Sequence, residues 1–426
     1  RLIEEKRYNI SIYSDLIQDK AAMIEKVNKY FGYAIKPTDF NLVQLEDGWL
    51  TYSHHWKIFS RYLEGFAQTL VTIKALHQFM PDIYIETATL HFGAIGVKLM
   101  NHKVKVVTYV HYPYTDVSFV DGYWWRFKDY HKKWPERIFN LFKYFYHSGL
   151  HFLYRLTAFA HDVVFTNSSW TQNHMSDRQW GQLPKVLFPP CSVTEFWADN
   201  FETKKEVAIS IGQFRSEKRH DVQLDMMKFH KTKHPESNLE LHIIGSGKFE
   251  ESELIYNKLL KRIEKEKIKN VKILKDLSFK DLQAEIKSAS FGIHTMIDEH
   301  FGIAVVDMLA AGLVTIAHNS AGPKDDILGN KTDALRGFLA NSDAEFNVTL
   351  NKVYEDWQTK EGKARLTALA EGAQNYVKQE MSNEAFGRKF YESIQRIESE
   401  LREDVIKRQK EAKPSKQPKG EETEDL

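Results

Sequence analysis

Two acidic residues and a glycine within one short segment have the types and the spacing to hold a nucleotide sugar. The segment EHFGIAVVDMLAAG begins at Glu299, carries its second acid at Asp307, and contains the pair Phe301 and Gly302. A glycine at a helix start lets a ligand approach the backbone, and the free amide groups of the first turn bind phosphate. Asp307 lies one turn beyond Ile303 on the same predicted helix face. Both acids could therefore face one ligand; the alternative is that they only favour the helix start through its dipole.

The elements around this segment predict where such a ligand would lie. Phe291–Met296 is short and apolar, which predicts a buried strand, and residues 297–300 form the loop at its carboxyl end. Ligands bind at this edge of open α/β sheets. We expect Gly312 to end the helix before the next apolar run, Leu313–Ala317.

Cations are predicted at the same edge of the sheet. The strand Val207–Ile211 ends in Gly212, and the loop that follows carries Arg215 and Lys218. A diphosphate needs such charges when it binds and again when it departs, because negative charge builds up on it as its bond to the sugar breaks. The alternative is that both side chains are simply solvated, as most lysines and arginines are.

Two more candidates follow predicted strands directly. Gly245 follows the strand Leu239–Ile244 and opens a tight turn toward the next helix, which supports the geometry of this edge. In the first half of the chain, His111 follows the strand Val104–Val110, where it could hydrogen-bond to a substrate. Isolated histidines are often structural residues, and this alternative stays open for His111 and for His294.

Composition limits the class of protein. A chain of 426 residues with 42% apolar residues can build two α/β cores. The 59 basic and 58 acidic residues nearly cancel, so no overall charge attracts nucleic acid. The single cysteine, Cys191, excludes an internal disulfide and favours a reducing compartment. No apolar run is long enough to cross a bilayer, and the start at Arg1, within a charged stretch, leads us to expect a first domain that is incomplete at its start.

Motifs for metal and serine chemistry are missing from the sequence. It contains no Asp-x-Asp pair, no cysteine or histidine pair at zinc spacing, no P-loop and no GxSxG motif. We therefore expect neither a metal nor a resident cofactor.

The chain divides at a double proline, Pro189 and Pro190, because two successive prolines continue neither a strand nor a helix. Residues 1–190 alternate strands with helices, and residues 191–390 do so more regularly, which predicts two doubly wound, Rossmann-like parallel sheets. Residues 391–426 predict a polar helix and, from Pro414, a disordered tail. The strands predicted in the first domain are Ile83–Glu86, Val104–Val110, Val163–Thr166 and Val186–Phe188.

An insert at residues 123–161 departs from the strand and helix alternation. It mixes tryptophan, tyrosine and phenylalanine with lysine and arginine at helical spacing. This composition is typical of a membrane interface. A helical insert whose rings form a core would show the same spacing, so both interpretations stay open.

With these residues in view, the chain resembles the retaining glycosyltransferases of family 4, which have the GT-B fold of two Rossmann-like domains facing a cleft. Within them it is most similar to GDP-mannose-dependent α-1,2-mannosyltransferases that extend a dolichol-diphosphate-linked oligosaccharide in N-glycan synthesis. The resemblance covers residues 82–390. Its most specific pieces are VHYP at Val110–Pro113, NSSWT at Asn167–Thr171, FPPC at Phe188–Cys191, SIGQFRSEK at Ser210–Lys218, and HTM, EHFGI, AHNS and GP within His294–Pro323.

The resemblance implies roles for the candidate residues. Glu299 would contact the donor mannose, and Asp307 would hold the ribose hydroxyls. Arg215 and Lys218 would bind the diphosphate, helped by the amides near Gly302 and Ile303, while His111 would lie beside the reacting sugar. Members of the family transfer the sugar with retention, without a metal and without a protein nucleophile.

The sequence departs from the family pattern in three ways. The second acid is usually glutamate, so the shorter Asp307 predicts a longer or water-mediated ribose contact. Gln213 follows Gly212 where many members have arginine, which leaves Arg215 as the substitute. The glycine-rich loop and membrane anchor expected near the amino terminus either precede Arg1 or are absent.

The implied partners are GDP-mannose, a dolichol-linked oligosaccharide and the cytosolic surface of the endoplasmic reticulum membrane. Other mannosyltransferases of the same pathway remain open as partners. Two alternatives also remain: another family 4 enzyme with a different sugar or linkage, and a non-catalytic relic that binds at the membrane surface.

Overall fold

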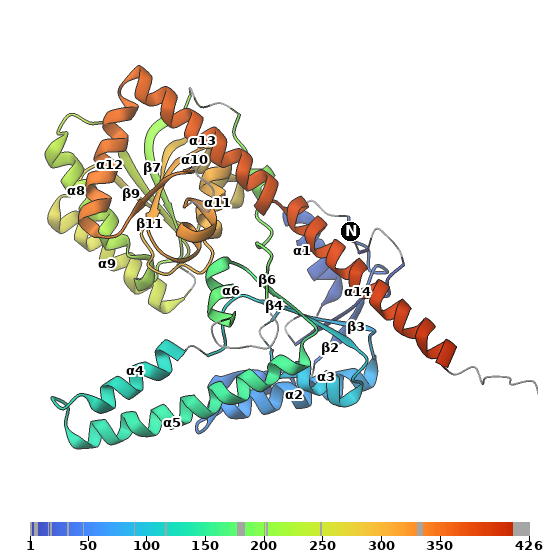
Figure 1. The fold of residues 1–426 in the computed structure, drawn as a ribbon. Helices are drawn as coiled ribbons and strands as arrows, with labels where there is room; N and C mark the ends of the chain where they lie inside the picture. The colour runs from blue at the N-terminus through green and yellow to red at the C-terminus, as the bar shows by residue number, and fades with distance from the viewer. Residues whose placement is uncertain are drawn as a thin grey trace, which may run out of the picture.

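The computed structural model describes residues 2–3, 7–15, 17, 19–31, 34–45, 47–88, 90–115, 117–176, 184–199, 201, 203–247, 249–329 and 335–411. They form two α/β domains with parallel sheets, one above the other in Figure 1, joined by the segment around the double proline. The predicted disordered tail, Pro414–Leu426, lies outside the described residues.

The C-terminal domain is a six-stranded parallel sheet in the order β12-β11-β10-β7-β8-β9. Along β7, Val207 and Ile209 face one apolar cluster while Ala208 faces another, so the sheet is buried on both sides. This explains why its strands read as continuous apolar runs. The strands are β7 (Lys205–Ile211), β8 (Glu240–Gly245), β9 (Val271–Lys275), β10 (Ala289–His294), β11 (Val314–His318) and β12 (Phe338–Ala340).

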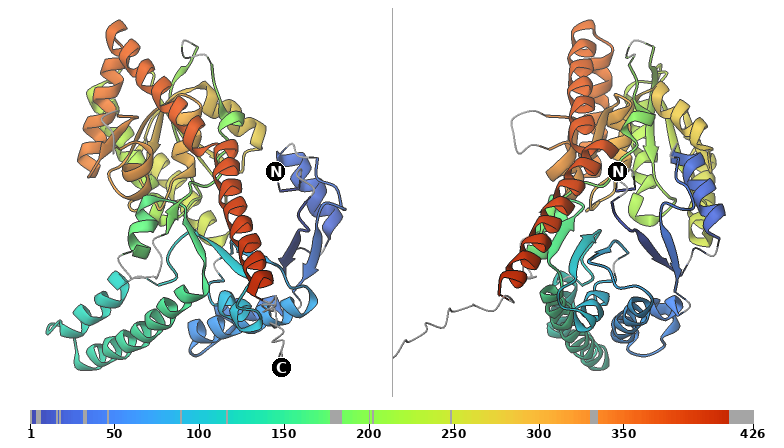
Figure 2. Two further views of the ribbon diagram at one scale, coloured as in Figure 1. Left: turned by 45° about the vertical axis from the view of Figure 1, so that its right-hand side comes forward. Right: turned by 90° about the vertical axis from the view of Figure 1, so that its right-hand side faces the viewer.

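Helices cover both faces of this sheet (Figures 1 and 2). Those against one face are α7 (Val193–Phe196), α10 (Phe279–Ser288), α11 (Ile303–Ala310) and α13 (Lys360–Met381). Those against the other are α8 (His220–Lys233), α9 (Glu250–Glu266) and α12 (Asp343–Trp357). Two short turns complete the domain, a 3-10 turn η4 (Ser216–Lys218) and a π-helical turn η5 (Pro323–Ile327).

The N-terminal domain holds a four-stranded parallel sheet in the order β3-β4-β5-β6. Its strands are β3 (Ile83–Glu86), β4 (Lys105–Val110), β5 (Val163–Thr166) and β6 (Lys185–Val186), close to the predicted ranges. The helices between them are α3 (Gly93–Met100) and α6 (Ser169–Ser176). Ser168 caps α6, because its hydroxyl accepts a hydrogen bond from the amide of Thr171.

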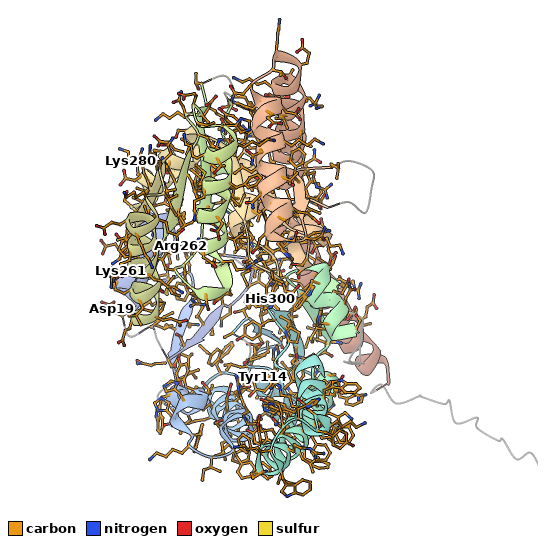
Figure 3. The ribbon with its side chains drawn as sticks, turned by 90° about the vertical axis from the view of Figure 1, so that its left-hand side faces the viewer. Asp19, Tyr114, Lys261, Arg262, Lys280 and His300 are labelled. Atoms are coloured by element: carbon orange, nitrogen blue, oxygen red, sulfur yellow. The ribbon has the colours of Figure 1, made fainter. Side chains whose placement is uncertain are left out.

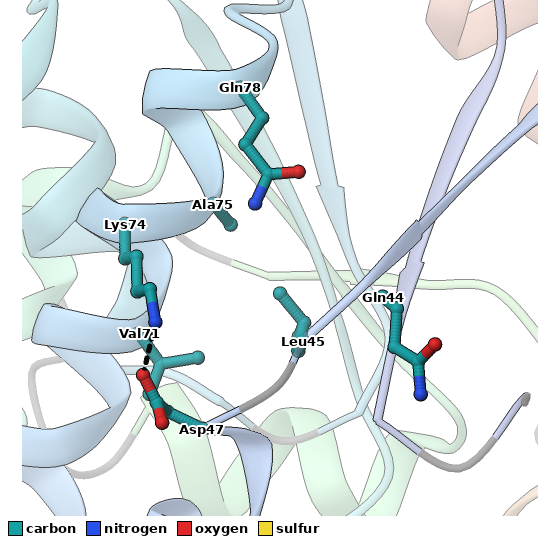
Figure 4. Close-up of a pocket in the computed structure, with 7 residues that line it drawn as sticks. All are labelled: Gln44, Leu45, Asp47, Val71, Lys74, Ala75 and Gln78. Carbon is teal, nitrogen blue, oxygen red and sulfur yellow. Dashed lines mark hydrogen bonds and ion pairs between the residues drawn. The ribbon is translucent and has the colours of Figure 1, made fainter.

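A second, two-stranded sheet precedes this one and was not predicted. It pairs β1 (Ser11–Ser14) with β2 (Asn41–Gln44) across helix α1 (Lys20–Phe31), and two 3-10 turns follow, η1 (Gly48–Thr51) and η2 (Ser53–His55). A cavity of about 1360 Å³ lies between β1, β3 and helix α2 (Ser60–Gln78). A smaller pocket beside it is bordered by β2 and α2, where the Lys74 amine and an Asp47 carboxylate oxygen are 2.5 Å apart (Figure 4).

The insert is a helical hairpin that projects from the sheet in Figure 1. Its helices are α4 (Val117–Lys128) and α5 (Trp134–Thr157), followed by the 3-10 turn η3 (Ala158–Ala160). None of the helices in the described part of the chain combines the length and the apolar character that a membrane span requires.

The last helix, α14 (Asn383–Glu411), returns to the N-terminal domain, as Figures 1 and 2 show. Ile394 and Ile397 are buried there beside Tyr109 and Phe165 of the N-terminal sheet. The predicted polar helix is therefore amphipathic, and it ties the two domains together.

Candidate functional site

Glu299, Lys218 and His294 meet at the carboxyl edge of the C-terminal sheet. Lys218 comes from the turn after β7, His294 ends β10, and Glu299 lies in the loop after β10. The Lys218 amine lies 2.5 Å from a Glu299 carboxylate oxygen, and His294 Nε2 lies 3.3 Å from the same oxygen. The side chains of Glu299 and Lys218 are only 18% and 21% exposed. The sequence places these two residues 81 positions apart, and the parallel topology brings them together.

The charge state of Glu299 follows from this setting. Burial disfavours the carboxylate, but the interaction with His294 and the charge of Lys218 outweigh burial and lower the pKa of Glu299 to about 2. The site therefore holds an ionised acid against a partly buried cation at neutral pH.

Two glycines make room for this arrangement. The Lys218 stem passes over Gly212, where an added Cβ would lie 3.3 Å from Lys218 Cδ. At Gly245, an added Cβ would lie 2.4 Å from the Gly212 carbonyl oxygen and 2.9 Å from the Phe214 ring. The ends of β7 and β8 thus approach each other more closely than side chains would permit, which gives the predicted Gly245 turn a packing reason.

The loop that carries Glu299 is held by residues of the AHNS and GP motifs, to which the sequence assigned no contacts. Asp298 has a positive φ of 53°, and its amide donates to the Ser320 hydroxyl at 2.8 Å. The Gly322 amide donates to the Glu299 carbonyl at 3.0 Å, and a Cβ on Gly322 would lie 2.3 Å from the Phe301 carbonyl oxygen. Ser320 of the AHNS motif and Gly322 of the GP motif thus hold the backbone of the loop that carries Glu299.

Gly302 begins α11 as predicted. Its φ of 110° is in the region that favours glycine, and its carbonyl accepts the first helical hydrogen bond, from Val305 at 2.9 Å. Ile303 is 50% exposed at this helix start, where the first-turn amides have no acceptor within the helix. Phe301, by contrast, points into the core and stacks on Phe188, so only its backbone is left for a ligand.

Asp307 has neighbours different from those of Glu299. Burial, with a contribution from Glu195, raises its pKa to about 7, and it in turn raises the pKa of the Cys191 thiol, although burial is the larger cause there. Its Oδ1 is buried without a hydrogen-bond partner within the described ranges, as is Oε2 of Glu195. These two oxygens could accept hydrogen bonds from a ligand; whether Asp307 and Glu299 contact the same one stays a prediction.

The predicted cation Arg215 is more exposed than Lys218. Its guanidinium lies 3.8 Å from a Glu217 carboxylate, and its side chain is 44% exposed. The loop is fixed instead by Thr295, whose hydroxyl donates to the Lys218 carbonyl at 2.8 Å and accepts from the Gln223 amide at 2.9 Å. Thr295 belongs to the HTM motif, but its contacts were not predicted, and Gln223 was not singled out, because a single polar residue in a helix carries no sequence signal.

Aromatic residues join the two domains beside Glu299. His300 stacks on Trp170 of α6 with 4.7 Å between ring centroids, and the Tyr112 ring lies 6.2 Å from it. The Ser169 amide also donates to a carboxylate oxygen of Asp326, in the C-terminal domain, at 2.8 Å. Figure 3 places His300 at this junction.

His111 precedes Tyr112 and therefore lies in the N-terminal loop that reaches the junction. Its Nε2 lies 3.1 Å from the Thr87 carbonyl oxygen, and its ring is exposed. Tyr112 thus reaches the domain junction beside the Glu299 loop, and a role of the neighbouring His111 beside a reacting sugar stays a prediction. No group of three metal-ligating side chains is found in the described part of the chain.

Family models match both halves of the chain. Residues 2–178 match the model described as ALG11 mannosyltransferase N-terminus, and residues 193–375 match glycosyl transferases group 1. Curated relatives are each named GDP-Man:Man(3)GlcNAc(2)-PP-Dol alpha-1,2-mannosyltransferase. The Candida glabrata protein is 31% identical over 373 residues, covering 83% of this chain and 71% of the relative. The Homo sapiens protein is 34% identical over 289 residues, covering 65% of this chain but only 58% of the relative.

Solved structures agree with the two-domain architecture. A glycosyltransferase from Rickettsia africae superposes with a TM-score of 0.62 at 16% identity, covering 92% of this chain and 91% of that one. Sucrose-phosphate synthase from Thermosynechococcus elongatus superposes with a TM-score of 0.65 at 12% identity. The match covers 93% of this chain and 91% of the synthase chain. At such low identity these matches show the fold alone, which is the predicted GT-B fold.

Proposed function

This chain belongs to the ALG11 mannosyltransferase family of group 1 glycosyltransferases, and on that premise we propose that it transfers mannose from GDP-mannose to a dolichol-diphosphate-linked oligosaccharide in α-1,2 linkage. The observation that carries the proposal is the ionised Glu299 held against Lys218 beside the amino terminus of α11. An acid, a partly buried cation and free helix amides lie at one sheet edge. They match the hydroxyls, the negative charge and the phosphate oxygens of a sugar diphosphate.

Each group has a part in donor binding. Lys218 and the first-turn amides of α11 bind the diphosphate, while Glu299 accepts hydrogen bonds from the mannose hydroxyls. Arg215 adds a second cation from the same loop. The buried, unpartnered Oδ1 of Asp307 accepts a hydrogen bond from a ribose hydroxyl. Since the pKa of Asp307 is about 7, the carboxyl is only partly ionised at neutral pH, which suits an uncharged hydroxyl partner.

The transfer step breaks the bond between the anomeric carbon and a phosphate oxygen and forms one from that carbon to an acceptor hydroxyl oxygen. The acceptor hydroxyl attacks from the face that the diphosphate leaves and passes its proton to the departing phosphate. Because both events take place on one face, the configuration is retained without a protein nucleophile. Lys218 and the helix amides stabilise the charge that develops on the diphosphate, which is the largest contribution expected at such a site. His111 lies beside the reacting sugar and orients the acceptor hydroxyl.

A dolichol-linked acceptor places the reaction at a membrane, and we assign it to the cytosolic face of the endoplasmic reticulum. The buried, unpaired Cys191 agrees with a reducing compartment. Other mannosyltransferases of the pathway, acting on the same lipid-linked substrate, are the proposed protein partners.

The proposal is tested by measuring mannose transfer from GDP-mannose to a phytanyl-linked trimannosyl-chitobiose acceptor, together with GDP binding by calorimetry. Glu299→Ala and Lys218→Ala are expected to lower kcat/KM by roughly a hundredfold or more. Lys228→Ala is the matched control, since Lys228 also pairs with a carboxylate, at 2.7 Å, but on the outer surface of α8.

Unaltered rates in both site variants would refute the site assignment. Transfer from a different sugar nucleotide alone would favour another family 4 reaction. A protein that binds GDP but transfers no sugar to any acceptor would favour the non-catalytic relic.

A further inference from the structure

Helix α5 exposes a long apolar face to solvent. Exposed aromatic and aliphatic side chains recur along it every three or four residues, which places them on one side of the helix. The face continues past the helix to Phe159, which is 85% exposed. Its members on α5 are Trp134, Ile138, Phe139, Phe142, Phe145, Phe152, Leu153 and Leu156.

The opposite side of the same helix is packed. Leu150 and Tyr154 are buried, the latter in the cluster beneath the N-terminal sheet. The rings of His147 and Tyr123 of α4 stack 5.1 Å apart, interplanar angle 5°. The exposed rings are therefore not the core of the insert, so the core interpretation is wrong for them, while the membrane interpretation stays a prediction.

Helix α2 extends this surface. Leu63, Phe66 and Leu70 lie one turn apart on its outer side and are 37%, 63% and 48% exposed. The two helices touch where the Tyr62 hydroxyl donates to the Tyr146 carbonyl at 2.7 Å. Figures 1 and 2 show α2 and α5 side by side at the end of the molecule away from the C-terminal domain. We call the exposed apolar residues of α2 and α5 the apolar face.

Basic residues lie among the rings. Residues 117–161 contain seven lysines and arginines but three acids. The Arg137 guanidinium lies 4.7 Å from the centroid of Tyr130 and 5.7 Å from that of Trp134, and the Lys143 amine lies 4.6 Å from that of Phe139. Rings with cations beside them suit the boundary between lipid headgroups and acyl chains. The same excess of positive charge opposes contact with a second copy of this surface.

We propose that the apolar face docks on an anionic phospholipid bilayer, with α2 and α5 lying in the plane of the interface. The inference deepens the proposed function and rests on it for one point, that the acceptor is attached to a lipid. Soluble monomers rarely expose so many adjacent rings, and their insertion among acyl chains removes this apolar area from water.

The face is connected to the candidate site by short contacts. The Tyr114 hydroxyl donates to the Arg61 carbonyl of α2 at 3.2 Å, and Thr115 Oγ1 lies 2.8 Å from His151 Nδ1 of α5. The loop of His111 and Tyr112 immediately precedes these residues. Figure 3 places Tyr114 between the two helices and His300. A docked bilayer surface thus lies on the side from which a lipid-linked acceptor must reach His111.

Flotation with liposomes tests this directly, using vesicles of phosphatidylcholine alone and with phosphatidylserine. The protein is expected to float with the anionic vesicles. Phe142→Ser with Phe145→Ser should lower its partition coefficient at least tenfold on both kinds of vesicle. Lys132→Glu with Lys133→Glu should lower it roughly tenfold on anionic vesicles only.

Matched controls lie on the other domain. Phe249→Ser removes a ring that is 58% exposed at the start of α9, and Lys258→Glu with Lys261→Glu reverses two exposed charges on that helix. Both controls should float like the unaltered protein. Circular dichroism and GDP binding should be unchanged in all variants, because every altered side chain lies outside the donor site.

Three outcomes would overturn the inference: no flotation, equal flotation of the Phe142 and Phe145 variant, or an oligomer in light scattering that this variant dissociates without any vesicle binding. The last result would assign the face to a second copy of the chain. The experiments distinguish failure of the docking proposal from failure of the proposed function. A protein that floats with vesicles but transfers no mannose refutes the activity. A protein that transfers mannose to an acceptor in detergent but does not float refutes the docking.

Discussion

The contacts of the Glu299 carboxylate with His294 and Lys218 contribute to the stability of the fold. The pKa of Glu299 falls from 4.5 to about 2 on folding, and each pKa unit corresponds to about 1.4 kcal/mol, so the ionised carboxyl contributes up to about 3 kcal/mol at pH 7. Because the folded pKa is lowered, this contribution is fully present above pH 4.5 and is lost as the pH falls toward 2.

Glu299→Gln keeps the shape of the side chain and removes its charge. We expect the free energy of unfolding, from urea titration, to fall by about 3 kcal/mol at pH 7 and by about 2 kcal/mol at pH 3.5. In a double-mutant cycle with Lys218→Gln, the two losses should be non-additive by about 1 kcal/mol or more, since removing one charge leaves the other partly buried without this partner.

Glu266→Gln is the control for this experiment. The pKa of Glu266 is also lowered to about 2, first by its hydrogen bond to Lys228, but that pair is exposed and its loss should have a much smaller effect. If Glu299→Gln unfolds at the same urea concentration as the unaltered protein, or if the cycle is additive, the pair is loose and solvated and the reasoning about the site is wrong.

Further predictions concern the surroundings of the site. Asp307→Asn should remove a pH dependence of stability. Because the folded pKa of Asp307 is raised to about 7, its contribution to stability is lost as the pH rises from 4 through 7. The unaltered protein should therefore have a free energy of unfolding about 3 kcal/mol lower at pH 8 than at pH 5 from this group, and the variant should lack this difference. Gly302→Ala should lower the free energy of unfolding, measured by urea titration, by about 1 to 3 kcal/mol. Backbone strain alone causes this loss, since φ is 110° and the added Cβ would lie no closer than 3.4 Å to a neighbouring atom. Gly245→Ala should cost about 2 kcal/mol by steric overlap, and an unchanged melting temperature would contradict the 2.4 Å approach. Trp170→Ala should lower kcat/KM for mannose transfer by about tenfold, because it removes the ring on which His300 stacks; equal kcat/KM would show that the junction does not position the Glu299 loop.

The local patterns of the sequence were sufficient for the C-terminal domain. Its strands are buried on both faces, so they read as apolar runs, and β10, β11 and α11 begin and end within about two residues of the predicted positions. The glycines at 302 and 312 were correctly assigned to the ends of α11, because positive φ angles leave a direct signal in residue type.

Other features gave no signal along the chain. The short strands β1 and β2 carry few apolar residues, and the amphipathic side of α14 becomes visible only where Ile394 and Ile397 meet the N-terminal sheet. The membrane and core interpretations of the insert could not be separated by periodicity, since a helix has the same spacing whichever of its sides is covered.

By itself, the sequence determined the class of fold, the edge of the sheet where the candidate residues lie and the family to which the chain belongs, because these follow from periodicity, glycine positions and long ordered motifs. Only the tertiary structure decided that Lys218 and His294 both contact Glu299. It also placed the Phe301 ring in the core and Asp307 beside Glu195. Finally, it showed that the rings of α5 face solvent. The physical reason is that side-chain contacts, burial and pKa depend on neighbours supplied by distant segments, and chain folding alone determines which segments become neighbours.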